Sequence, residues 1–280
     1  MRLCCNRERF FSMRILFLGD VVGASGCSKI FENLESEIKR KKINFVVING
    51  ENSAEPGVGL TGKTCDDFFN HGVNVITTGN HVWDQKEIMN YIDQEKRLLR
   101  PQNLFEPAPG KGFGIYETNE NMKIGVLNLM GNVFMKKCDD VFDISKNFLK
   151  KYQLKKDYDF LIVDFHGEIT SEKNAIGHFF DGNATLVVGT HTHVPTNDAR
   201  ILNRGTGYQT DAGMCGDYDS VIGMNKENSL NRFLKEKSTK HFTANGDATL
   251  CGVIVDCDIE TGLAKNIETY IFGGQLKNTL

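Results

Sequence analysis

Short apolar runs recur along the chain, and each of them ends in polar residues. Five such runs occupy residues 14–23, 45–52, 73–81, 159–168 and 184–193. Within a run, aliphatic and β-branched residues follow one another without alternation, which is typical of strands that are buried on both faces. Because such strands occur in sheets that helices cover, we predict an α/β fold.

The first two runs are separated by a stretch with helical spacing. In residues 28–43, the apolar positions Ile30, Leu34 and Ile38 recur at near-helical intervals, which predicts an amphipathic helix. A further apolar run at 123–131 predicts another strand. The chain therefore opens with a strand–helix–strand unit.

The last third of the chain predicts a hairpin, and the middle predicts a loop. Residues 249–262 and 266–272 are two strand-like stretches with a turn at Thr261-Gly262. Residues 100–114 hold three of the five prolines, together with three glycines and an asparagine. This composition indicates a long surface loop.

We find no internal repeat and no linker, so we predict a single domain over residues 13–280. A chain of 280 residues lies near the upper limit for one hydrophobic core. Residues 1–12 precede the first predicted strand and are expected to be an unstructured appendage. An upstream start codon is the simplest explanation for them.

The lack of a targeting signal and the net charge argue against a secreted protein, a membrane protein and a protein that binds long nucleic acids. The basic start lacks the apolar segment of a signal peptide, and no run approaches the roughly 20 apolar residues of a membrane helix. The eight cysteines are scattered without a CxxC pair, which favours reduced thiols and a cytoplasmic location. The net charge of −3 argues against binding of a long nucleic acid, but not against a small anionic substrate at a metal site.

The polar residues that end the five runs are all able to bind a hard or borderline metal ion. They are Asp20, Glu51 with Asn52, Asn80 with His81, His166, and His191 with His193. In α/β sheets the loops at the carboxyl ends of the strands form the ligand crevice, so we expect these residues to converge. Their oxygen and imidazole groups together suit iron, manganese or zinc.

Taken singly, each of these residues has an ordinary structural explanation. Asp20 could cap a helix, His166 could be a hydrogen-bonded histidine at a strand end, and Asn80 could lie in a turn. The joint pattern favours a metal site, because four of the seven histidines directly follow a predicted strand. In an extended segment, side chains two residues apart lie on the same face, so His191 and His193 would both face the crevice.

Five longer motifs contain these residues: GDVVG, INGENSA, TTGNHVWD, DFHGE and GTHTHVPTNDA, in this order. With them the chain, from about Met13 to its end, resembles the YmdB-like branch of the calcineurin-like metallophosphoesterases. The resemblance implies a four-layer α/β sandwich, in which two central β-sheets flanked by helices carry two metal ions at their loop edge. It also implies a phosphodiesterase that acts on cyclic nucleotides, 2′,3′-cyclic ones included.

The resemblance further implies a role for each residue of the motifs. Three residues would bind the first metal: Asp20, Asn52 and His193. Three would bind the second: Asn80, His166 and His191. Glu51 would bridge both metals, and His81 would meet the scissile phosphate. The chain has two valines after Asp20 where the wider superfamily has a DxH motif, which leaves the first metal without one histidine.

Two metals roughly 3.5–4 Å apart can bind a phosphate ester and convert a bridging water into the attacking hydroxide. His81 would then protonate the departing alkoxide, a step that contributes roughly 10²–10⁴ in rate. We therefore predict a phosphodiesterase with two divalent or mixed-valence transition-metal ions, iron or manganese, and a small nucleotide-like substrate. No membrane partner is expected, and an oligomer is compatible with the sequence.

Other functions are weighed against this one. A phosphomonoesterase of the same fold would differ only in pocket shape, and a non-catalytic regulatory or RNA-associated protein could keep the metal site as a scaffold. A Rossmann-type oxidoreductase fits poorly, because GDVVGASG lacks the G-x-G-x-x-G spacing. The segment 211–216 either adds a glycine-rich wall to the pocket or forms a simple turn.

Overall fold

Two mixed β-sheets lie face to face at the centre of the fold. The computed structural model describes residues 13–105, 107–235 and 240–279, so the predicted appendage at 1–12 lies outside the described residues. In the first sheet the strands follow the order β2-β11-β12-β1-β3-β4, and β13 pairs with β12. These strands are β1 (Met13–Leu18), β2 (Asp20–Val21), β3 (Phe45–Asn49), β4 (Val75–Thr77), β11 (Met214–Asp217), β12 (Ala248–Cys257) and β13 (Ala264–Phe272).

The second sheet has the strand order β5-β6-β7-β8-β10-β9. Its strands are β5 (Phe113–Glu117), β6 (Lys123–Met130), β7 (Phe160–His166), β8 (Leu186–Thr190), β9 (Arg200–Ile201) and β10 (Gly207–Gln209). Strands β1, β3 and β4 run parallel in the first sheet, as do β6, β7 and β8 in the second. Within each sheet, the carboxyl ends of these strands therefore lie at one edge, where ligands are expected.

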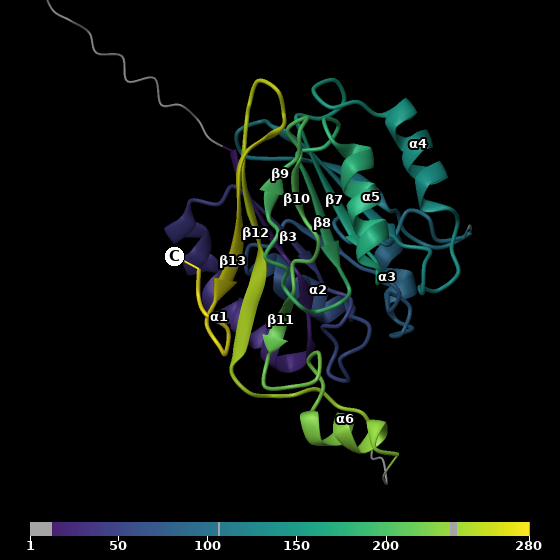
Figure 1. The fold of residues 1–280 in the computed structure, drawn as a ribbon, viewed down its shortest axis with the longest axis vertical. Coiled ribbons are helices and arrows are strands. Elements are labelled where there is room, and N and C mark those ends of the chain that lie inside the picture. The colour runs from purple at the N-terminus through teal and green to yellow at the C-terminus, as the bar shows by residue number, and fades with distance from the viewer. Residues whose placement is uncertain (1–12, 106, 236–239, 280) are drawn as a thin grey trace, which may run out of the picture.

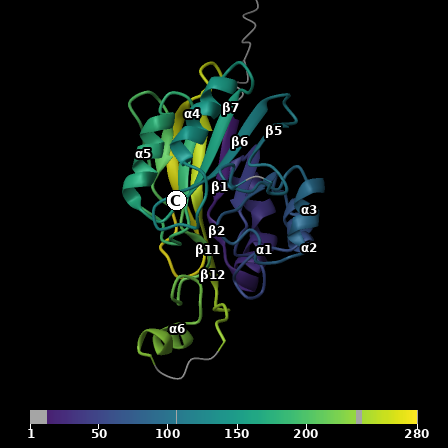
Figure 2. The same cartoon turned by 90° about the vertical axis from the view of Figure 1, so that its right-hand side faces the viewer.

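Helices cover the outer face of each sheet, as Figures 1 and 2 show. Along the first sheet lie α1 (Gly23–Lys41), α2 (Gly62–Asn70) and α3 (Ile88–Gln94), and along the second lie α4 (Val141–Lys151) and α5 (Thr170–Phe180). The short helix α6 (Lys226–Phe233) projects away from the sheets (Figure 1). The predicted four-layer sandwich is thus confirmed. Among the described helices, none has the length and apolar character needed to cross a membrane.

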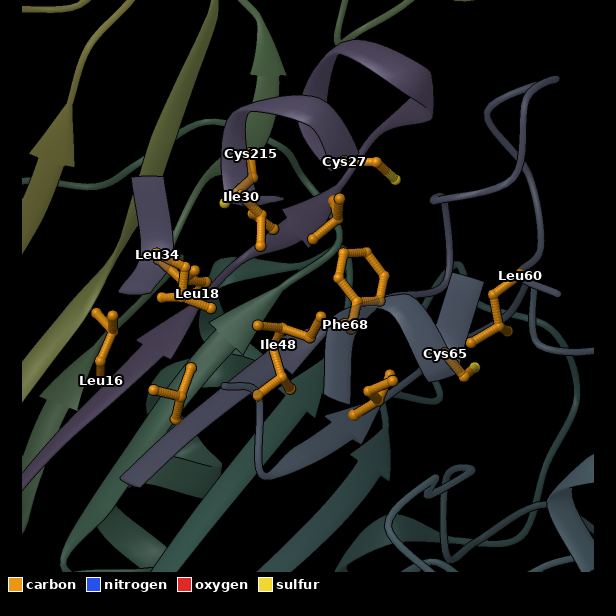
Figure 3. Close-up of a cluster of buried hydrophobic side chains, with 14 of the residues drawn as sticks. Leu16, Leu18, Cys27, Ile30, Leu34, Ile48, Leu60, Cys65, Phe68 and Cys215 are labelled. Carbon is orange, nitrogen blue, oxygen red and sulfur yellow. The ribbon is translucent and has the colours of Figure 1, made fainter. Parts of the chain in front are cut away.

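The strands are apolar without alternation because both faces of each sheet are buried. Leu16 and Leu18 of β1 face the helices, where they pack with Ile30 and Leu34 of α1 and with Phe68 of α2 (Figure 3). Ile15 and Phe17, which alternate with them on β1, belong to a second cluster that fills the space between the two sheets. A third cluster lies between the second sheet and helices α4 and α5.

The segment at 100–112 is largely irregular, as predicted, but part of it is buried rather than on the surface. Arg100 and Asn103 are buried, and β5 begins at Phe113. Arg100 donates hydrogen bonds to several backbone carbonyls of the loop, and the Asn103 amide donates to the carbonyl of Met130 at 2.7 Å. Because a guanidinium has five donors, it can be buried where loop carbonyls would otherwise lack partners.

Candidate metal centre

Three predicted ligands meet at the edge where the two sheets face each other. Glu51 follows β3, His166 ends β7, and His191 follows β8. One candidate ligand atom of each lies within 4.8 Å of the other two. The closest pairs join His166 Nε2 to Glu51 Oε1 at 2.9 Å and to His191 Nδ1 at 3.1 Å. Carboxylate and imidazole groups at this spacing can bind a common transition-metal ion.

Three more predicted ligands extend this cluster around His166. Asn80 Oδ1 lies 3.0 Å from His166 Nε2. On the other side, Asp20 Oδ1 lies 3.8 Å from His166 Nδ1 and 3.8 Å from His193 Nε2. Side chains from both sheets therefore form one continuous set of contacts from Asn80 to His193.

Two buried oxygens at this edge lack a hydrogen-bond donor among the described residues. They are Asp20 Oδ1 and Asn52 Oδ1. The other Asp20 oxygen accepts from the backbone N–H of His191 at 3.0 Å, and the Asn52 amide nitrogen donates to the carbonyl of Gly57 at 2.9 Å. These bonds fix the orientation of both groups. A buried acceptor without a donor costs free energy, and a cation would satisfy both oxygens. The donor set therefore fits a metal ion.

The electrostatics of the cluster favour the protonated imidazolium form of His166 beside an ionised Glu51. Burial opposes ionisation of Glu51, but the charge and hydrogen bond of His166 outweigh it and lower the Glu51 pKa to about 2. Burial also disfavours the imidazolium of His166, yet the charges of Glu51 and Asp20 raise its pKa to about 9. Burial and the charge of His166 lower the His191 pKa to about 3, so that this imidazole is neutral. Cation binding displaces protons from such ligands.

A buried hydrogen-bond relay fixes the tautomer of His166. The Thr190 hydroxyl donates to Asp164 Oδ1 at 2.7 Å and lies 2.9 Å from His166 Nδ1. Because a hydroxyl has one hydrogen, Thr190 must accept from Nδ1–H. Nε2–H then faces the acceptor oxygens of Glu51 and Asn80, and a metal ion would replace this hydrogen. Such second contacts orient metal-binding histidines in proteins.

Comparison with known proteins decides the family. The family model described as YmdB-like protein matches residues 16–270. The chain belongs to the YmdB-like family. All eight predicted site residues, from Asp20 to His193, lie within the matched region.

Relatives of this YmdB-like chain include one curated protein and two solved structures. A Bacillus subtilis (strain 168) protein named 2′,3′-cyclic-nucleotide 2′-phosphodiesterase is 43% identical over 256 residues, which cover 91% of this chain and 96% of that protein. A Mycoplasma pneumoniae structure described as a novel phosphatase has a TM-score of 0.86 and 37% identity, covering 94% of each chain. A hypothetical protein from Thermus thermophilus has a TM-score of 0.86 and 36% identity, covering 94% of this chain and 100% of that one.

In this YmdB-like chain, His81 lies beside the cluster rather than within it. Its backbone N–H donates to Glu51 Oε2 at 2.9 Å, whereas its Nδ1 lies 2.6 Å from Asp84 Oδ2. The carboxylate of Asp84 therefore accepts from Nδ1–H, which leaves Nε2 available to a substrate. Lys136, from the loop after β6, donates to the Asn80 carbonyl at 2.5 Å and lies 3.7 Å from Asp84. Neither Asp84 nor Lys136 was among the predicted site residues.

The extended geometry expected for His191 and His193 is wrong. Strand β8 ends at Thr190, and the two histidines have φ angles of 97° and 65°, so the chain turns here. Asp211 holds this turn, because its carboxylate accepts from the backbone N–H and the hydroxyl of Thr192 at 3.2 and 2.7 Å. Both imidazoles still reach the centre, but backbone curvature rather than alternation brings them there.

The remaining sequence expectations are resolved by local contacts. Asp20 is no helix cap, because α1 begins after Val22 and has no side-chain cap. Segment 211–216 forms the expected turn, and Met214 rather than its glycines lines a cavity. Gly213 turns the chain with a φ of 81°, and Met214 begins β11 and lines a cavity beside His193. The segment therefore contributes to the wall of a pocket.

Proposed function

We propose that this chain is a metal-dependent phosphodiesterase that hydrolyses small phosphodiesters, 2′,3′-cyclic nucleotides among them. The observation that carries the proposal is the convergence of Glu51, His166 and His191 beside the donor-free oxygens of Asp20 and Asn52. The name of the Bacillus subtilis relative supports the substrate class. Two transition-metal ions, iron or manganese, suit this mixture of carboxylate, amide and imidazole ligands.

The contacts support a division of the ligands between two ions. Asn80 and His191 both contact Nε2 of His166, so these three residues would hold one ion. Asp20 and His193 approach each other on the opposite side of His166, and with Asn52 they would hold the other. Glu51 would bind both ions. Bound in this way, the two cations would offset the charge of the phosphate and supply a nucleophile at neutral pH.

The protein's own part in the reaction rests on His81 and its partners. When the P–O bond breaks, the leaving oxygen takes a proton from His81 Nε2. Asp84 contacts Nδ1 of the same ring at 2.6 Å, which fixes the orientation of the ring. The hydrogen bond from the His81 backbone to Glu51 keeps the ring beside the ligands.

The test uses protein stripped of metal and reloaded with single metals. Activity is measured on a 2′,3′-cyclic nucleotide, a nucleoside monophosphate and a chromogenic diester, together with metal analysis. We expect the stripped protein to be inactive, and manganese or iron to restore diester hydrolysis better than magnesium. Full activity after verified metal loss would overturn the proposal. A preference for the monophosphate would instead identify a phosphomonoesterase.

A further inference from the structure

A cavity of about 330 Å³ lies directly beside the candidate metal centre. His193 forms part of its wall, and the other lining residues are Val194, Met214, Tyr218, Ser220, Val221 and Ile222. Its volume falls in the range of sites that bind small molecules, roughly 300–1,000 Å³. A group bound here would be next to a phosphate held at the metal centre.

The polar groups in the wall of this cavity are already hydrogen-bonded. The Tyr218 hydroxyl accepts from the backbone N–H of Met214 at 2.9 Å, and the Ser220 hydroxyl accepts from Gly223 N–H at 2.8 Å and donates to Asp217. Nδ1 of His193 bonds to the carbonyl of Ile222 at 2.8 Å. The cavity therefore offers apolar surface and no charged side chain, which suits an uncharged group with apolar faces.

The backbone at Ile222 has a conformation that is unfavourable for its β-branched side chain. Ile222 and Gly223 have φ angles of 49° and 92° in the turn between the bridged residues Val221 and Met224. Such turns favour Asn-Gly, whereas a β-branched residue at positive φ is strained. The carbonyl bond to His193 explains the conformation but not the isoleucine, since asparagine would orient the same carbonyl.

Two large apolar side chains at this cavity are more than half exposed. Val194 is 57% exposed and Ile222 is 55% exposed, and both line the cavity. Exposed apolar surface around a cavity is typical of a ligand site. On the basis of the proposed function, we infer that this cavity binds the nucleobase of the substrate while the metal centre binds its phosphate. Val194 and Ile222 are then specificity-determining residues.

The experiment compares substrates with and without a base, using the metal-loaded full chain. We measure kcat/KM for adenosine 2′,3′-cyclic phosphate relative to that for glycerol 1,2-cyclic phosphate. Val194→Trp fills the cavity and Ile222→Ala removes one wall, and each should lower this ratio roughly tenfold, mainly through KM for the nucleotide. Ile115→Ala removes another exposed apolar side chain from β5, on the other sheet, and should leave the ratio within about twofold of the parent's.

Phe134 marks an alternative place where the nucleobase could bind. It is 83% exposed at a φ of 61°, in the loop that carries Lys136. If the ratio falls only in Phe134→Ala, the base binds at that loop and the inference is overturned. Unchanged ratios in both cavity variants, with metal content intact, would overturn it equally.

Product binding separates this inference from the proposed function. Isothermal titration of the metal-loaded protein compares adenosine 3′-phosphate with glycerol phosphate, and we expect tighter binding of the nucleotide, lost in Val194→Trp. If the parent turns over neither cyclic substrate but shows this base-dependent binding, the proposed function fails and the cavity stands. Equal affinity for the two ligands in the parent would refute the cavity.

Discussion

The layer between the two sheets is filled differently along its length. In the middle of the strands, Phe17, Ile162 and Leu186 belong to an apolar cluster. Toward the carboxyl ends, the same layer contains Asn49 and Asp164, both fully buried, with the Asn49 amide donating to Asp164 at 3.0 Å. An apolar contact requires only matching shape, whereas a buried polar group costs free energy unless its hydrogen bonds are made.

The apolar middle of this layer stabilises the fold, whereas its polar end orients the candidate metal ligands. Asp164 acts on the candidate centre through Thr190, whose hydroxyl contacts His166. Among the described residues, no such side-chain relay connects the apolar part of the layer to a site residue. We therefore expect substitutions in the polar part to change metal binding and turnover, and substitutions in the apolar part to change only stability.

The largest effect should come from Glu51→Gln. An amide cannot neutralise two cations as a carboxylate does, so turnover should fall to background while the protein remains folded. Activity, metals per chain and the thermal unfolding midpoint are measured. Glu55→Gln changes an exposed glutamate of the same loop and should behave like the parent. Near-normal turnover with two metals per chain in Glu51→Gln would exclude the bridging role.

His81→Ala should lower turnover of a ribose phosphodiester about 10²-fold, because the leaving alkoxide loses its proton donor. A nitrophenyl diester has an acidic leaving group and should be affected much less, and metal content should not change. Steady-state kinetics on both substrates measure the contrast. Equal losses on the two substrates would show that His81 only orients the phosphate.

Thr190→Val should weaken metal binding by roughly 10–100-fold, because it removes the acceptor that fixes the His166 tautomer. Valine has nearly the same shape as threonine, and Thr190→Ser keeps the hydroxyl and should retain the parent's affinity. Competition with a chelator of known affinity measures the metal Kd. Parent-like affinity in Thr190→Val would refute the relay.

The smallest functional effect is expected for Ile162→Val, two residues before Asp164 on the same face of β7. It removes one buried methylene and should cost about 0.5–1.5 kcal/mol of unfolding free energy. Metal affinity and kcat/KM should equal the parent's, as denaturant unfolding and kinetics can test. A marked loss of metal affinity would mean that the two parts of the layer are coupled.

Much of the fold could be predicted because apolar runs report burial directly. Each of the five runs contains a strand, and the terminal hairpin of β12 and β13 is also confirmed, with Gly262 at a φ of 75° in its turn. The short strands β9 and β10 carry too few residues to show a period. Arg100 could not be predicted as buried, because its partners are carbonyls of a folded loop.

The convergence of the site residues was predictable for a general reason, since parallel strands end at one edge. The residues behind them were not. Asp164 stands as a polar residue inside an apolar run, a signal that the sequence offered, but its partners Asn49 and Thr77 come from the opposite sheet. Only the register between the two sheets reveals such pairs. The curvature at His191 likewise depends on Asp211, 20 residues further on.

The same Asp211 is paired with Lys173 of α5 at 2.6 Å, and both side chains are 1% exposed. Loss of either partner would leave an uncompensated buried charge, at a cost of about 3–5 kcal/mol. Helix α5 therefore cannot detach while the turn at 191–193 stays in place. Separating Lys173 from Asp211 would leave each of these two charged groups without its partner. The amide hydrogens of helix α5 and of the turn at 191–193 should therefore exchange with solvent as one cooperative unit. Local unfolding of the helix would then also displace His191 and His193 from the candidate metal centre.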